Sequence, residues 1–175
     1  FLLAFAYPVL GVFVPRVLKS VLPEDFPGRP PLLSMPSRET ALAAVTSTLV
    51  ILKVSEILEQ SSDLSSALKL VILSSLAVAQ WLALDGSLVS FCSALLAGIA
   101  GPLAELPFLA AGFWHYLPAA VDYMPLAGFD VPVPPEQLGL SSLTGPCYFA
   151  VTTDSIAWWR FFQATSSADK GVRHG

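Results

Sequence analysis

Charged residues are scarce in this sequence. Asp, Glu, Lys and Arg make up 13% of its 175 residues, about half of the roughly 25% that is usual in soluble domains. The acidic residues outnumber the basic ones, 13 to 9, and the basic residues form no cluster, which argues against a nucleic-acid-binding protein. Hydrophobic residues make up 54%. This composition predicts an all-α, polytopic membrane protein with residues 1–175 in a single domain.

Cysteine and histidine are also rare, with two residues of each. Cys92 and Cys147 lie within apolar runs, and their spacing to the histidines matches no metal site, so no metal is expected. The first residues, FLLAFAYPVL, begin inside an apolar run and lack the charged start of a signal peptide. We therefore expect that the natural N-terminus is missing or that a targeting segment has been removed.

The clearest transmembrane segment runs from Ser87 to Gly112. Glu105 is its only ionisable residue, and its length suits a hydrocarbon core of about 30 Å, which needs about 20 helical residues. Gly98, Gly101 and Ala104 form a small-residue face that another helix can approach closely. This segment is the helix around which the remaining helices are expected to pack.

The remaining apolar runs predict four further helices. They cover residues 1–15, 37–59, 65–84 and 144–163, and Ser37 is expected to cap the second of these helices. Loops are predicted at 16–37 and 117–142, and a polar, frayed tail at 164–175. Seven Lys and Arg residues fall on the side of the first loop and the C-terminus, and two on the other side. This bias places the C-terminus in the cytosol, or in the stroma of a plastid.

Three ionisable residues within or next to the helices are candidates for ligand contacts. Glu105 and Asp154 lie in predicted membrane helices, where an ionisable residue is a functional candidate by default. For both, a carboxyl group that only hydrogen-bonds a neighbouring helix is the competing interpretation. His115 is a candidate ligand for a chlorophyll magnesium or a haem, or an interfacial residue beside Trp114.

The sequence offers little support for catalysis. It has no HExxH motif, no paired aspartates in the YD and GxGD settings of aspartyl intramembrane proteases, and no serine near His115. The pigment-binding helix signature of light-harvesting proteins is absent as well. A non-enzymatic role is therefore predicted.

Short motifs in the same order along the chain carry a resemblance to a known family. They are Tyr7-Pro8, Trp81 four residues before Asp85, Tyr116 with Asp122 downstream, Pro146 with Tyr148-Phe149, and Arg160 near the end of the last helix. This pattern resembles the insulin-induced-gene (Insig) family of small membrane proteins. The run from Gly101-Pro102 to Glu105 looks like the branch of that family found in cyanobacteria and plant plastids.

The resemblance implies six transmembrane helices, of which one would precede Phe1, and a lipid-accepting central cavity. We expect Trp81, Glu105 and the small-residue face to line that space and to hold a lipid, a sterol or a pigment such as chlorophyll or carotenoid. No cofactor is required by this interpretation. The resemblance also marks Asp85 as a position for partner binding.

Two roles remain open, with membrane lipids and other integral membrane subunits as the expected partners. The first is an accessory subunit of a larger complex, in particular a photosystem supercomplex in the thylakoid. Its expected contact is an aromatic end of the last helix, consisting of Trp158, Trp159, Phe161 and Phe162. The second role is a lipid or sterol sensor, or a retention protein, in the endoplasmic reticulum. An ordinary interfacial aromatic belt is the simplest alternative explanation of the aromatic residues.

Overall fold

The computed structural model describes residues 9–21, 36–126 and 133–172. In these residues the protein is all-helical, as predicted, and the one β-type pairing is an isolated antiparallel bridge between Tyr123 and Leu140. The helices are η1 (Val9–Phe13), α2 (Val14–Lys19), α3 (Arg38–Gln60), α4 (Ser66–Leu84), α5 (Leu88–Ala110), η2 (Pro135–Leu138) and α6 (Thr144–Val172). Three of them, α3, α4 and α5, are long and apolar enough to cross a membrane. This is the composition of an integral membrane protein.

The three spanning helices begin in the same way. Ser37, Ser65 and Ser87 each stand one residue before a helix, and each hydroxyl accepts a hydrogen bond from the backbone N–H three residues on, at 3.2–3.3 Å. Such a cap is worth about 1 kcal/mol, because it satisfies one of the N–H groups that a helix start leaves open. The predicted cap at Ser37 is thereby confirmed.

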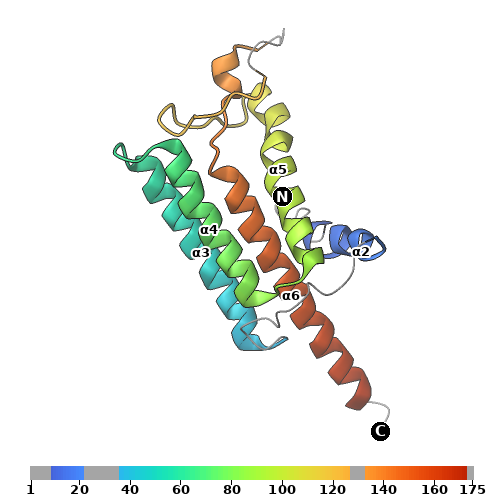
Figure 1. Ribbon diagram of the computed structural model, residues 1–175. Coiled ribbons are helices and arrows are strands. Elements are labelled where there is room, and N and C mark those ends of the chain that lie inside the picture. The colour runs from blue at the N-terminus through green and yellow to red at the C-terminus, as the bar shows by residue number, and fades with distance from the viewer. Residues whose placement is uncertain (1–8, 22–35, 127–132, 173–175) are drawn as a thin grey trace.

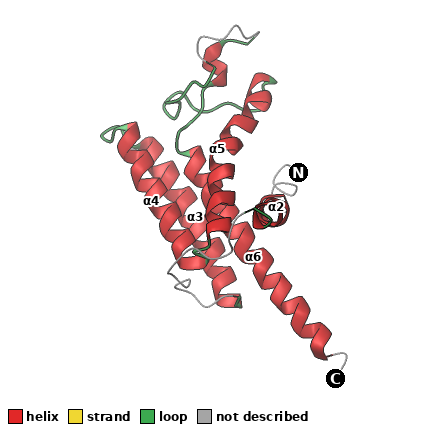
Figure 2. Cartoon of the chain, turned by 45° about the vertical axis from the view of Figure 1, so that its right-hand side comes forward, coloured by secondary structure: helices red, strands yellow, loops and turns green. Residues whose placement is uncertain are grey.

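The four long helices form an antiparallel bundle with α6 at its centre. Helices α3, α4 and α5 all pack against α6, and Figure 1 and Figure 2 show α6 running between them and continuing past the bundle towards the C-terminus. The start of α3, the α4–α5 turn and the C-terminal part of α6 lie at one end. The α3–α4 turn and the long connection between α5 and α6 lie at the other.

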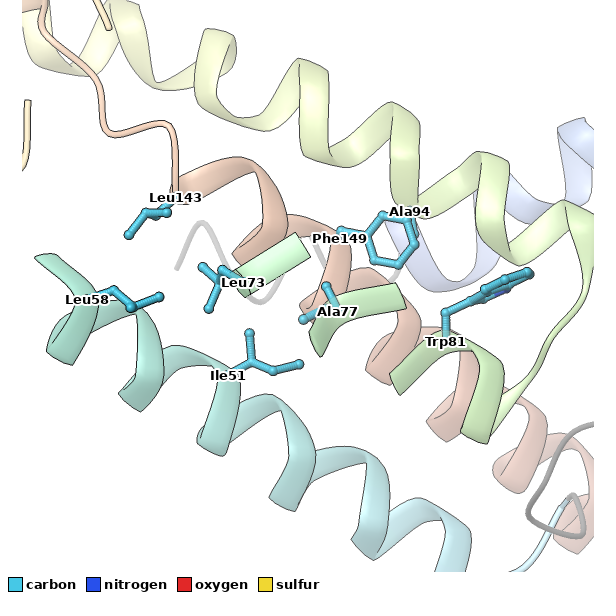
Figure 3. Close-up of a cluster of buried hydrophobic side chains, with 9 residues drawn as sticks. Ile51, Leu58, Leu73, Ala77, Trp81, Ala94, Leu143 and Phe149 are labelled. Carbon is cyan, nitrogen blue, oxygen red and sulfur yellow. The ribbon is translucent and has the colours of Figure 1, made fainter. Parts of the chain in front are cut away.

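The core lies where side chains of α3 and α4 meet α6. Ile51 and Leu58 of α3 face Leu73 and Ala77 of α4, with Phe149 of α6 beside them, as Figure 3 shows. The central helix is buried on all sides from Phe149 to Ala157 except at Val151, which is partly buried. The outer helices instead expose large apolar side chains such as Leu49, Val71 and Ile99. Apolar residues on the outside of a bundle of this kind face lipid.

The structure differs from the sequence prediction at two helix boundaries. Residues 16–19, expected in a loop, are helical, because the first helical segment continues from Val9 to Lys19 without a break. Residues 164–172, expected as a frayed tail, continue α6, and no proline interrupts them. The predictions for residues 1–8, 22–35, 127–132 and 173–175 lie outside the described residues.

Candidate functional site

A buried ion pair closes the end of the bundle where α4 turns into α5. Asp85 is 4% exposed, and its carboxylate accepts a hydrogen bond from the Arg160 guanidinium of α6 and one from Ser87 Oγ at 2.8 Å. Trp81 donates its indole N–H to the backbone oxygen of Ser87 at 3.0 Å. Gly86 allows this turn, because its φ of 68° lies in the left-handed region. The predicted partner residue Asp85 is therefore engaged within the chain.

A second polar cluster joins α5 to α6 at the opposite end. The Glu105 carboxylate accepts hydrogen bonds from the Tyr116 hydroxyl at 2.5 Å and from the Tyr148 hydroxyl at 2.9 Å. The Tyr116 and Thr144 hydroxyls lie 3.0 Å apart. Burial, and next the hydrogen bond to Glu105, raise the pKa of Tyr116, so its phenol stays neutral and keeps donating. Two interpretations of Glu105 were open, a ligand contact and a carboxyl group that hydrogen-bonds a neighbouring helix. The hydrogen bond from Tyr148 of α6 matches the second.

Trp81 and Glu105, which were expected to line one ligand space, lie at different ends of the bundle. Trp81 is 5% exposed and packs in a tilted arrangement on Phe91 near one end, with ring centroids 4.8 Å apart, whereas Glu105 lies near the other end. Helix α6 packs closely against the two glycines of the small-residue face, whereas Ala104 is exposed. A Cβ on Gly98 would lie 3.0 Å from the Gly145 oxygen, and one on Gly101 would lie 2.6 Å from the Tyr148 ring. The prediction that a helix approaches this face is confirmed at both glycines.

Asp154 is one of several buried polar residues inside the bundle. It is 3% exposed on α6, and the neighbouring side chains of Thr152, Thr153 and Ser155 are buried as well. Gln80 of α4 is buried too and donates its side-chain amide to Thr48 Oγ1 at 2.7 Å and Ser47 Oγ at 3.0 Å. Gln80 is a polar residue in an otherwise apolar part of α4, a signal that the sequence contained and that our prediction missed.

His115 lies on the surface after the end of α5. Its side chain is exposed, while the adjacent Trp114 stacks on Phe108 with ring centroids 5.4 Å apart. Within residues 9–21, 36–126 and 133–172, no group of His, Cys, Asp and Glu is arranged to hold a metal ion. The interfacial interpretation of His115 fits this position more directly than ligation does.

The predicted aromatic end of α6 is a contiguous cluster. Trp158 packs on Phe161 at 5.8 Å and on Phe162 at 5.4 Å between ring centroids. Phe162 is 51% exposed, and the other three rings, including Trp159, are partly buried. The cluster flanks Arg160, so it lies at the level of the ion pair with Asp85, where the bundle ends and α6 continues.

A hollow opens beside this aromatic cluster. Its volume is about 620 Å³, and Trp159, Phe162, Gln163, Ala164 and Ser166 line it. The guanidinium carbon of Arg16, from α2, lies 5.4 Å from the centroid of the Trp159 ring. Arg16 was assigned to a loop by sequence, so its proximity to α6 was not predicted.

No protein-family model, no curated protein sequence and no solved structure matches the chain.

Proposed function

We propose that this chain is a non-enzymatic accessory subunit of a larger membrane complex and that it carries bound lipid or pigment. The observation that carries the proposal is the aromatic cluster of Trp158, Phe161 and Phe162 on α6, at the point where this helix leaves the bundle. Aromatic side chains packed on one another and still partly exposed are typical of the centre of protein interfaces.

The hydrogen bonds of the charged side chains within the bundle support a structural role. Arg160 bonds Asp85 between α6 and the α4–α5 turn, and Glu105 bonds Tyr148 and Tyr116 between α5 and α6. Both carboxylates thus hold helices together. Ionisable groups in a membrane serve either chemistry or internal pairing, and these two are paired.

The family resemblance supports a location for the proposed complex. Because the resemblance is to the plastid and cyanobacterial branch, we place the proposed subunit in the thylakoid. Its proposed partner there is a photosystem supercomplex. Chlorophyll or carotenoid is then the expected pigment, held against the aromatic cluster of α6. A sensor or retention protein in the endoplasmic reticulum would instead bind its client through Asp85. The buried position of Asp85 favours the subunit.

Native gel electrophoresis of solubilised membranes tests the proposal. We expect the chain, detected by antibody, to migrate with a large complex in several mild detergents, and with chlorophyll if the complex is a photosystem. The double variant Trp158→Leu, Phe161→Leu should release the chain as a small species. The matched control is Leu95→Ala, Ile99→Ala, which alters exposed apolar side chains of α5. Migration of the unaltered chain as a free small protein, or with a sterol-regulated client, would overturn the subunit role.

A further inference from the structure

The first helical segment carries an exposed apolar stripe. Val9, Phe13, Val17 and Val21 recur at every fourth position and are 48%, 64%, 50% and 77% exposed. Val9, Phe13 and Val17 lie about one turn apart in the helical segment Val9–Lys19 and form the stripe, whereas Val21 follows the end of α2. The opposite face is held against the bundle, since η1 packs on α6 and α2 on α5. Gly11 makes this contact close, because a Cβ there would lie 2.9 Å from the Ser155 oxygen.

Arg16 lies at the edge between this stripe and α6. Its side chain is exposed, and among the described residues its contact is the face of the Trp159 indole rather than a carboxylate. A guanidinium that makes a cation–π contact with a ring face can still direct N–H donors towards an anion. This contact therefore places a positive charge beside the Trp159 ring, which also lines the hollow.

The hollow lies at the boundary between membrane and water. Trp159 precedes Arg160, which bonds Asp85 in the turn between two spanning helices, so this level marks the end of the membrane spans. Gln163 and Ser166 add polar groups to the hollow, one and two turns further along α6. A hollow lined by aromatic and polar side chains, next to a guanidinium and with an exposed apolar stripe on the first helical segment, suits a phospholipid, which has an anionic headgroup and acyl chains.

We propose that the hollow at Trp159 binds the headgroup of an anionic membrane lipid, with Arg16 as the residue that contacts its phosphate and the stripe of Val9, Phe13 and Val17 as the surface for its acyl chains. This site deepens the proposed function, because it names the class and the position of the bound lipid. It depends on the membrane location but not on membership in a complex. A chain that migrates alone on native gels and still selects anionic lipid would refute the subunit role and leave this site standing.

Native mass spectrometry of the purified protein with a defined lipid mixture tests the site. The probe is an equimolar mixture of phosphatidylglycerol and phosphatidylcholine with identical acyl chains. We expect preferential retention of phosphatidylglycerol by about fivefold, the effect of one basic residue at a membrane surface. Arg16→Ala should abolish this preference. Arg16→Lys should keep only part of it, since an ammonium lacks the planar stack.

Two further variants separate a built site from general attraction. Trp159→Leu leaves every charge in place and should also reduce the preference, because Arg16 loses its support. Lys53→Ala removes an exposed cation at the other end of the bundle and should change nothing. Circular dichroism and gel filtration check that each variant is folded. Equal retention of the two lipids by the unaltered protein, an unchanged preference in Arg16→Ala or Trp159→Leu, or an equal loss in Lys53→Ala would each overturn the proposal.

Discussion

Asp85 is the residue on which one end of the bundle depends. It is buried, and its charge is balanced by Arg160, whose side chain is 36% exposed. Removing one partner of a fully buried ion pair costs about 3–5 kcal/mol, because the other charge stays buried and unpaired. Since Arg160 reaches water, the cost here should be smaller.

We expect Asp85→Asn to lower the free energy of unfolding by about 2 kcal/mol, below the range for fully buried pairs. Titration with SDS from a mild detergent, followed by circular dichroism, measures this value. Glu56→Gln is the control, because it removes the exposed pair of Glu56 with Lys53, and such pairs contribute roughly 0–1 kcal/mol. Equal effects of the two substitutions would show that the buried pair does not stabilise the bundle.

Tyr116 links stability to alkaline pH. Its pKa is raised above the ordinary value of 10.0 by burial and by the hydrogen bond to Glu105, so the folded state favours the neutral phenol. A group whose pKa is raised in the folded state contributes stability that is complete below its unfolded pKa. That contribution is lost as the pH rises above this value.

The unaltered protein should therefore lose thermal stability as the pH rises above about 10, and Tyr116→Phe should lose less over the same interval. At neutral pH the order is reversed, because the variant lacks the hydrogen bond to Glu105. Thermal unfolding in detergent across this pH range provides the measurement. Tyr123→Phe, at an exposed position, is the control. The prediction fails if Tyr116→Phe and the unaltered protein share one pH profile.

At the scale of the helices, α5 and α6 form the tightest contact. Gly101 lies against the Tyr148 ring, where even a Cβ would come within 2.6 Å of ring carbon Cγ. A larger side chain would displace the ring and break the bond from the Tyr148 hydroxyl to Glu105. Overpacking of this kind typically costs about 1–3 kcal/mol.

We expect Gly101→Leu to destabilise the protein by about 3 kcal/mol, at the upper end of the overpacking range. Ala100→Leu, at an exposed position of the same helix, should have little effect. The double variant Gly101→Leu, Tyr148→Ala should recover part of the loss, because the smaller residue makes room. Unfolding curves of these variants, of Tyr148→Ala alone and of the unaltered protein complete the comparison, and strict additivity in the double variant would argue against direct contact.

The sequence predicted the long helices well, because their signals are local. The serines at 37, 65 and 87 and the apolar runs after them define α3, α4 and α5 to within a few residues. Gly98 and Gly101 of α5 also predicted a close contact with another helix. The polar residues of α6 are different: Thr152, Thr153 and Asp154 are buried by three other helices, and a local pattern carries no information about such packing.

The pairing of site residues was not predictable from the sequence for the same reason. Arg160 and Asp85 are 75 positions apart, and Tyr148 and Glu105 are 43 apart. Glu105 was singled out as an ionisable residue in a membrane segment, and the other three residues were singled out through the family resemblance. The partner of each depends on the register in which α6 meets α4 and α5. The contact of the Tyr148 ring with Gly101 depends on the same register, so the sequence did not predict it either.

For the whole molecule, the placement of charge predicts an orientation in the membrane. Arg16, Arg38 and Arg160 belong to the end of the bundle that holds the α4–α5 turn, whereas Lys53 and Lys69 lie towards the opposite end. Basic residues accumulate on the cytoplasmic side of membrane proteins, so the extension of α6 should face the cytosol or the stroma. The α3–α4 turn should then face the other compartment.

Cysteine labelling with a membrane-impermeant maleimide tests this orientation. Ser62 in the α3–α4 turn and Ser166 on the extension of α6 are both exposed, so a cysteine at either position can react wherever water reaches it. In sealed vesicles of the protein's own membrane with the cytosolic or stromal face outwards, Ser166→Cys should be labelled directly, and Ser62→Cys only after permeabilisation. The partly buried Cys92 and Cys147 supply the background, which the unaltered protein measures. The reverse labelling pattern would show that the α3–α4 turn faces the cytosol or the stroma, and labelling of both positions in sealed vesicles would contradict an antiparallel bundle that spans the membrane.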